Sequence, residues 1–117
     1  MDIDYFSGTV ASGKTTNMIR SVVSEVDKGK TCLFFGEMNY DNFNSLSNHL
    51  LSYVDNYFPC SVYDYLSDVK EVVDNITFKV DIVYIDGYNS NMSSLVKTLA
   101  PLGDVKLKMS INIIKRF

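Results

Sequence analysis

The sequence contains few of the residues that build metal centres or disulfide frameworks, with two cysteines and one histidine in 117 residues. Cys32 and Cys60 lie far apart, and neither has a neighbour at the spacing of metal ligands. We therefore expect both thiols to be reduced, with Cys32 buried in an apolar strand. His49 has no second candidate ligand close to it in the sequence, so we expect it on a helix surface rather than in a metal site.

Long apolar runs are also missing from the sequence. No stretch approaches the ~20 apolar residues that a membrane-spanning helix needs. The N-terminal "MDIDYF" lacks the basic and apolar regions of a signal peptide. The sequence therefore predicts a cytoplasmic protein, in the host cytoplasm if it is viral, with no membrane partner.

Positive charge is in short supply, because 11 lysines and arginines stand against 14 acidic residues. The net charge of −3 argues against a protein whose whole surface binds nucleic acid. Beyond residue 104 the balance reverses, with Lys106, Lys108, Lys115 and Arg116 close together. This basic end could contact a phosphate backbone. It could equally be the solvated face of a strand, since Lys106 and Lys108 alternate with apolar residues.

The length and the hydrophobic pattern predict one α/β domain over residues 1–117. Apolar runs of strand length alternate with helical patterns, which is typical of a three-layer α/β/α arrangement around a mostly parallel sheet of about five strands. We expect Pro59 to break the chain before the third strand. The expected strands are 3–7, 30–35, 60–65, 80–86 and one within 105–114, and the expected helices are 15–28, 41–54, 68–75 and 90–99.

The stretch "SGTVASGKTT", residues 7–16, contains the pattern G-x-x-x-x-G-K-[ST] between the first expected strand and helix. Glycines permit the tight turn that points successive backbone N–H groups at a phosphate, and the following helix aims its positive end at the same anion. Lys14 supplies a mobile positive charge for the β- and γ-phosphates of ATP. The candidate nucleotide-binding residues are Gly8, Thr9, Val10, Ala11, Ser12, Gly13, Lys14, Thr15 and Thr16.

Two oxygen-bearing residues are candidates for holding Mg²⁺ beside the nucleotide. The Thr15 hydroxyl is a hard ligand, and Asp86 follows four strongly apolar residues in "DIVYIDG". A carboxylate at the end of a buried strand loses solvation, and a metal would compensate that loss. The alternative is that Asp86 caps the following turn. Asp81 begins the same expected strand and should therefore lie at the opposite end of a parallel sheet.

A general base is not supplied next to Asp86, because Gly87 follows it. Ligands gather at the carboxyl ends of parallel strands, so the end of a neighbouring strand is the other place to look. Glu37 lies just past the second expected strand and could activate a water aimed at the γ-phosphate. The alternative is that Glu37 is an acid favoured by the dipole at a helix start.

With these motifs in place, the sequence resembles the RecA/DnaB-like family of P-loop ATPases, the ring-forming helicase and recombinase cores. "GEMN" is similar to the "LEM" of replicative helicases, and "VDIVYIDGYN" is similar to "LIVIDYLQ". The resemblance implies a P-loop NTPase fold in which Lys14 and Thr15 bind the phosphates and Mg²⁺. It also implies that Glu37 is the catalytic base and Asp86 the second magnesium anchor.

The resemblance has departures. The family's sensor strand ends in a polar residue near the γ-phosphate, for which Ser110 and Asn112 are both candidates here. The family's later strands, DNA-binding loops and trans-acting arginine lie beyond the matched part, and Arg116 matches no motif. We therefore expect a minimal core of the kind that a virus would encode.

Three functions remain open from the sequence. The first is a Mg²⁺-dependent ATPase module of DNA replication or recombination, with single-stranded DNA or a replication protein as partner and homo-oligomerisation as a family expectation. The second is a regulatory protein that binds the nucleotide and docks on a larger ATPase or helicase. The third is a nucleoside kinase, because the loop also resembles that of thymidine kinases, although their glutamate after the magnesium aspartate and their later zinc-binding cysteines are missing here.

Overall fold

The computed structural model describes residues 1–8, 13–37, 54–61, 63–88 and 90–112 of the chain. These residues form a five-stranded sheet in which every neighbouring pair of strands is parallel, in the order β1-β5-β4-β2-β3. The strands are β1 (Ile3–Gly8), β2 (Cys32–Glu37), β3 (Tyr57–Cys60), β4 (Ile82–Ile85) and β5 (Lys106–Asn112). The helices are α1 (Lys14–Asp27), α3 (Tyr65–Asn75) and α4 (Met92–Leu99), followed by a 3₁₀ turn over Ala100–Leu102.

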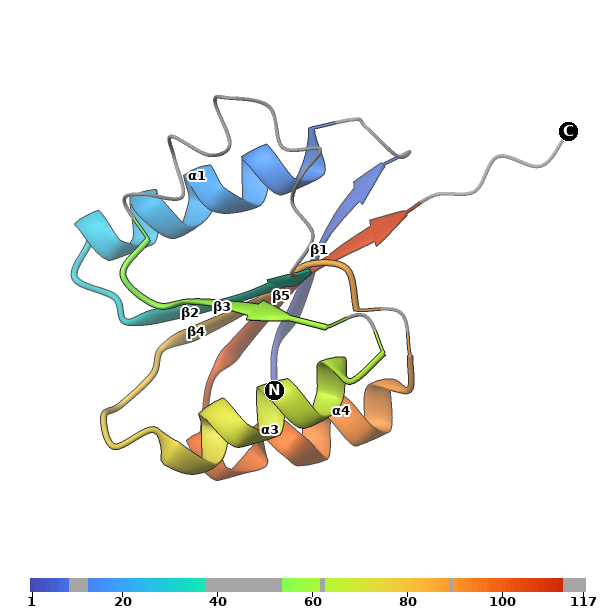
Figure 1. Ribbon diagram of the computed structural model, residues 1–117. Helices are drawn as coiled ribbons and strands as arrows, with labels where there is room; N and C mark the ends of the chain where they lie inside the picture. The colour runs from blue at the N-terminus through green and yellow to red at the C-terminus, as the bar shows by residue number, and fades with distance from the viewer. Residues whose placement is uncertain (9–12, 38–53, 62, 89, 113–117) are drawn as a thin grey trace, which may run out of the picture.

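The helices cover both faces of the sheet, so the predicted α/β/α layering is confirmed. Figure 1 shows α1 on one face and α3 with α4 on the other. A parallel sheet needs this cover because its crossover connections place helices on its faces. None of the described helices combines the length and the apolar character that crossing a bilayer requires.

Each face of the sheet carries its own apolar core. Under α1, the fully buried Met18 and Ile19 pack with Phe34 and Tyr84 of the sheet. On the opposite face, α3 and α4 bury a second cluster against the strands. All four residues of β4 are buried, as the continuous apolar run of this strand predicted. β4 is the middle strand of the five, so its carboxyl end lies at the middle of the carboxyl edge of the sheet.

The prediction of the third strand was wrong. The expected strand was 60–65, whereas β3 spans Tyr57–Cys60 and α3 already begins at Tyr65. Pro59 does not break the chain but lies within β3, opposite Gly36 of β2. Proline has no N–H for a sheet ladder, so it is tolerated in an outer strand. Among the described strands β3 is one of the two at the edges of the sheet, which explains why Pro59 fits there.

The alternating lysines of β5 lie on an interior strand with one polar face. β5 pairs with β1 on one side and β4 on the other, and Leu107 and Met109 are buried toward α3 and α4. On the other face Lys106 forms a 2.8 Å ion pair with Asp4, and the Lys108 ammonium lies 5.6 Å from the centre of the Tyr84 ring. Two cations of the basic end therefore have partners within the fold. The expected helix at 41–54 falls almost wholly outside the described residues, and His49, Lys115 and Arg116 lie outside them.

Candidate functional site

The start of α1 forms one wall of the candidate site. Gly13 precedes the helix with φ of 84°, a left-handed conformation that favours glycine. Its carbonyl accepts the first helical bond, from the Asn17 N–H at 3.0 Å, and no side chain caps the helix. Lys14 and Thr15 thus occupy the first positions of a helix whose positive end faces the carboxyl edge of the sheet. β1 ends at Gly8, and Thr9, Val10, Ala11 and Ser12 lie outside the described residues.

Three side chains from three different elements meet at this edge. The Thr15 hydroxyl donates a 2.8 Å hydrogen bond to Oδ2 of Asp86. The Ser110 hydroxyl donates to the other carboxylate oxygen, Oδ1, at 2.7 Å. We call Thr15, Asp86 and Ser110 the edge cluster. It joins the predicted phosphate loop to the predicted magnesium carboxylate.

Asp86 is placed by the strand before it. Its N–H continues the ladder beyond β4 by donating to the Phe35 carbonyl at 2.8 Å. The residue is 9 % exposed, so its carboxylate is largely removed from water. Such burial is costly unless hydrogen bonds compensate, and the two hydroxyls of the edge cluster provide them. Both of these donors come from distant parts of the chain.

The backbone after Asp86 explains why no acid follows it. Gly87 has φ of 87°, the left-handed region in which a side chain is strained. Its N–H donates to the Ser110 hydroxyl at 3.3 Å. Ser110 is therefore a polar residue of β5 that reaches Asp86. The other candidate, Asn112, is opposite Gly8 in the strand register, and only its backbone is described.

Glu37 is the last residue of β2, and only its backbone is described. β2 and β4 are neighbours and run parallel, with Phe35 opposite Ile85. Their carboxyl ends therefore meet at the same edge, so Glu37 follows this pair by two positions and Asp86 follows it by one. The backbone thus brings the ends that carry Glu37 and Asp86 together, while Asp81 lies at the opposite end and accepts from the Thr31 N–H at 2.9 Å.

The donor set of the edge cluster suits a hard cation. Its ligand atoms are hydroxyl and carboxylate oxygens, which Mg²⁺ prefers. The Thr15 hydroxyl donates its hydrogen to Asp86 and keeps its oxygen lone pairs for a cation. The described residues contain no group of three histidines, cysteines or acids that could form an all-protein cage. Mg²⁺ bound with a nucleotide takes many of its ligands from phosphate oxygens and water.

Tyr65 is a site residue that the sequence did not reveal. Its buried hydroxyl lies 2.8 Å from the Phe35 carbonyl oxygen and 2.7 Å from that of Asp86. The sequence pattern instead placed Tyr65 in the third strand. The one available signal was chemical: a buried tyrosine requires a hydrogen-bond partner for its hydroxyl.

The two cysteines take no part in the edge cluster. Both are buried and reduced, and Cys32 lies in β2 as predicted. Burial raises the pKa of Cys32 to about 11 and that of Cys60 to about 12. Thiols with such raised pKa values carry little thiolate near neutral pH, so neither is a candidate nucleophile.

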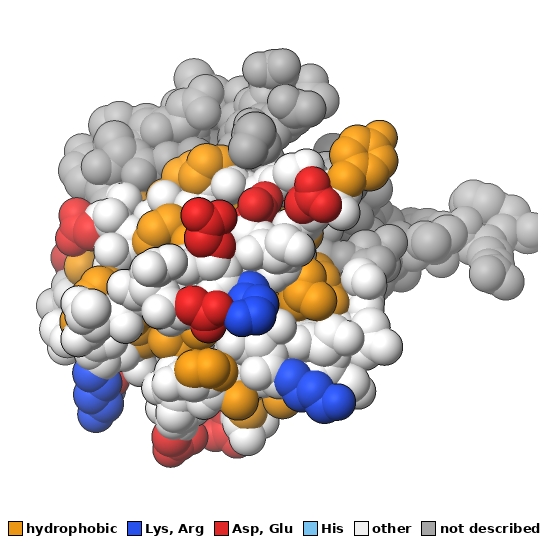
Figure 2. Space-filling model, turned by 60° about the horizontal axis from the view of Figure 1, so that its bottom comes forward, with side chains coloured by type: hydrophobic (Ala, Val, Ile, Leu, Met, Phe, Trp, Pro, Cys, Tyr) orange, Lys and Arg blue, Asp and Glu red, His pale blue; other side chains and the backbone are white. Residues whose placement is uncertain are grey.

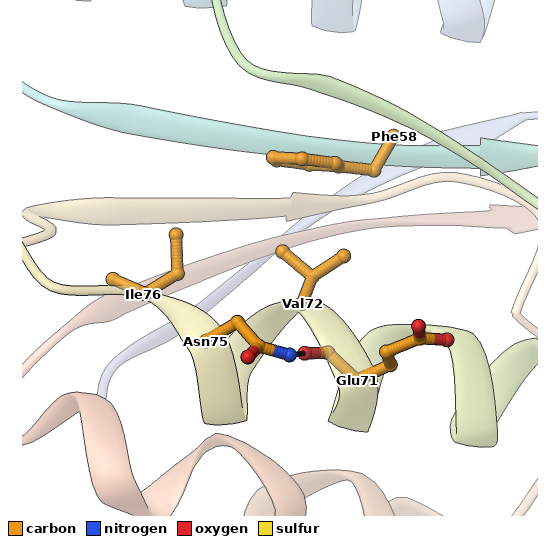
Figure 3. Close-up of a pocket in the computed structure, with 5 residues that line it drawn as sticks. All are labelled: Phe58, Glu71, Val72, Asn75 and Ile76. Atoms are coloured by element: carbon orange, nitrogen blue, oxygen red, sulfur yellow. Dashed lines mark hydrogen bonds between the residues drawn. The ribbon is translucent and has the colours of Figure 1, made fainter.

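Two further features of the surface are a pocket and the distribution of charged side chains. An open pocket of about 320 Å³ lies between β3 and α3, and it contains no residue of the edge cluster. Figure 3 shows Phe58, Val72 and Ile76 as its apolar lining, with Glu71 and Asn75 along α3. Figure 2 shows acidic, basic and apolar side chains interspersed on the face it presents, without a concentrated basic patch.

No family model matches the chain, and no curated protein sequence matches it either. The functional interpretation therefore depends on the chemistry and placement of its own residues.

Proposed function

We propose that this chain is a P-loop NTPase domain with a RecA/DnaB-like core that binds ATP with Mg²⁺ and hydrolyses it. The observation that carries the proposal is the Thr15–Asp86 hydrogen bond at the carboxyl edge of a parallel sheet. It links the last residue of the G-x-x-x-x-G-K-[ST] pattern to the carboxylate that follows the buried strand β4. Ligands of open parallel sheets bind at this edge.

The chain's own groups would share the work of holding the nucleotide. The left-handed Gly13 lets α1 begin directly after the loop, so backbone N–H groups at its start can donate to phosphate oxygens. Lys14, the first residue of α1, would offset the charge of the β- and γ-phosphates. Thr15 and Asp86 would hold Mg²⁺, whose positive charge would offset the charge of the phosphates when it is bound.

Hydrolysis would need one further group to receive a proton. A water oxygen forms the new bond to the γ-phosphorus, the bond to the ADP oxygen breaks, and the products are ADP and phosphate. We assign the proton acceptance to Glu37, because β2 delivers it to the edge that also carries Asp86. Backbone N–H groups and Lys14 would stabilise the charge on the phosphate oxygens in the transition state.

We further propose that the domain works with single-stranded DNA or a DNA replication or recombination protein, and that it forms homo-oligomers. This part follows from the sequence resemblance. Lys106 and Lys108 have partners within the fold, so DNA contacts from the basic end would depend more on Lys115 and Arg116. Binding of single-stranded DNA that weakens steeply with added salt would support this part.

The test is ATP turnover and ATP affinity measured on the wild type, Glu37→Gln and Glu71→Gln. Glu71 is an exposed acid of α3 and serves as the matched control. Glu37→Gln is expected to bind ATP normally and to lose about 10²–10⁴-fold in kcat, the contribution of a positioned base. Glu71→Gln should turn over ATP like the wild type.

Each alternative to the proposed function or to the role of Glu37 predicts a different outcome. Unchanged turnover in Glu37→Gln would remove Glu37 as the base. A wild type that binds ATP without turnover, alone or with DNA, would favour the regulatory protein. Transfer of the γ-phosphate to a nucleoside would favour the kinase.

A further inference from the structure

The ladder between the neighbouring strands β2 and β4 ends at the edge where the candidate site lies. Their pairing runs from Cys32 opposite Ile82 to Phe35 opposite Ile85. On its other side β2 stays paired with β3 to its last residue, with Gly36 opposite Pro59 and Glu37 opposite Cys60. The chain after β4 instead turns at Gly87. The last printed backbone bond between β2 and the chain after β4 therefore runs from the Asp86 N–H to the Phe35 carbonyl.

The Tyr65 hydroxyl lies where this ladder ends. It is within hydrogen-bonding distance of the Phe35 carbonyl in β2, at 2.8 Å, and of the Asp86 carbonyl after β4, at 2.7 Å. A phenol has one hydroxyl hydrogen, so the two carbonyls share it. One side chain thus bridges the main chains of both strands, where the regular ladder between them ends.

The ring of Tyr65 is held firmly enough for this bridge to resist movement. Tyr65 is 5 % exposed and begins α3, within the core that contains Phe35 and Val69. Its ring packs edge-on against that of Tyr88, with centroids 5.7 Å apart. A tyrosine has only two side-chain torsions between its backbone and its ring, so packing of the ring fixes the hydroxyl.

We propose that Tyr65 is a positioning residue that fixes the separation between the carboxyl ends of β2 and β4, and so between Glu37 and Asp86. The inference rests on the proposed function, because the bridge sets the separation between the base and the carboxylate of that site. Tyr65 acts through these two main chains. A displacement of about 1 Å at a reacting centre can lower a rate about 10²-fold, so such a bridge matters more for turnover than for binding.

The test compares Tyr65→Phe with Tyr88→Phe. Tyr88 is the matched control, because it is also a buried tyrosine and its hydroxyl donates to the Asn91 carbonyl at 2.6 Å, within its own loop. Tyr65→Phe is expected to lower kcat about tenfold or more while KM and ATP affinity stay within about twofold. Tyr88→Phe is expected to leave kcat within about twofold of the wild type. A purely structural role would lower the melting temperature without this split between kcat and KM.

A second measurement does not depend on activity. Hydrogen exchange of the Asp86 amide, followed by NMR, is expected to be about fivefold or more faster in Tyr65→Phe than in Tyr88→Phe, since the bridge holds its acceptor strand in place. Equal exchange in the two variants would overturn the inference, as would an unchanged kcat in Tyr65→Phe. If the wild type binds no ATP, the proposed function fails, and the exchange result alone decides whether Tyr65 holds the two strand ends together.

Discussion

Thr15 and Asp86 are 71 positions apart in the chain, yet the hydroxyl of the first donates a 2.8 Å hydrogen bond to the carboxylate of the second. The bond joins the first turn of α1 to the end of β4. Asp86 also accepts a hydrogen bond from the hydroxyl of Ser110, which lies on β5, the strand between β1 and β4. Asp86 therefore connects the start of α1, the end of β4 and β5 through hydrogen bonds, next to the predicted phosphate loop.

Replacing Thr15 with valine should distinguish the contribution of the hydroxyl from the contribution of the side chain's shape. Valine keeps the branched shape but leaves the largely buried Asp86 without one of its donors, which should cost about 1–3 kcal/mol of stability. ATP affinity in the presence of Mg²⁺ should fall about tenfold or more, or about 1.4 kcal/mol. The control is Thr15→Ser, which retains the hydroxyl and should bind like the wild type. Titration calorimetry and thermal unfolding would measure both effects, and equal behaviour of the valine and serine variants would contradict the role of the hydroxyl.

The two aspartates that flank β4 offer a test of position along one strand. Asp86→Asn keeps the size of the side chain but removes the charge that a Mg²⁺ ligand needs, so Mg²⁺ should no longer strengthen ATP binding. Asp81→Asn makes the same change at the amino end, where Oδ2 of Asp81 accepts from the Thr31 N–H. We expect the Asp81 variant to keep its Mg²⁺ response.

The measurement is the dissociation constant of ATP with Mg²⁺ and with a chelator present. Retention of the full Mg²⁺ response in Asp86→Asn would show that the carboxylate does not hold the cation. Loss of the response in both variants would point to a general disturbance of β4 instead.

The ion pair between Asp4 and Lys106 should make part of the folding stability depend on pH. The hydrogen bond from Lys106 lowers the pKa of Asp4 below the usual value of 3.8. A group with a lowered pKa stabilises the folded state above its unfolded pKa, and this stabilisation is lost as the pH falls through the folded value. The pKa of Lys106 is raised above 10.5 by the same bond, so its contribution is present below that value and is lost as the pH rises above it.

Chemical unfolding between pH 2 and 7 would test this for the wild type and Asp4→Asn. The stability difference between them should be present above about pH 4 and should disappear in more acidic solution. It should be small, and it should shrink in 1 M salt, because both side chains are exposed to solvent. Asp27→Asn, at the exposed last residue of α1, is the control for removing a surface carboxylate. A difference that stays constant down to pH 2 would contradict the pairing.

The sequence by itself determined the layered α/β class, the parallel character of the sheet and the positions of most elements. These follow from local rules: a continuous apolar run of four to six residues favours a strand buried on both faces, and a 3.6-residue apolar period favours a covering helix. The phosphate-loop pattern is equally local, and the left-handed Gly13 agrees with it. The misplaced third strand shows the limit of such rules, because Pro59 is acceptable only in an outer strand and strand order is not visible along the chain.

Only the tertiary structure decided which side chains meet. Asp86 contacts Thr15 and Ser110 because β5 lies between β1 and β4 and because the register puts Ser110 within reach of the carboxylate. Tyr65 reaches the Phe35 and Asp86 carbonyls because the fold places the first residue of α3 where the ladder between β2 and β4 ends. Local periodicity sets the type of each element, whereas contacts between residues tens of positions apart depend on strand order, register and packing. Those are properties of the folded chain as a whole.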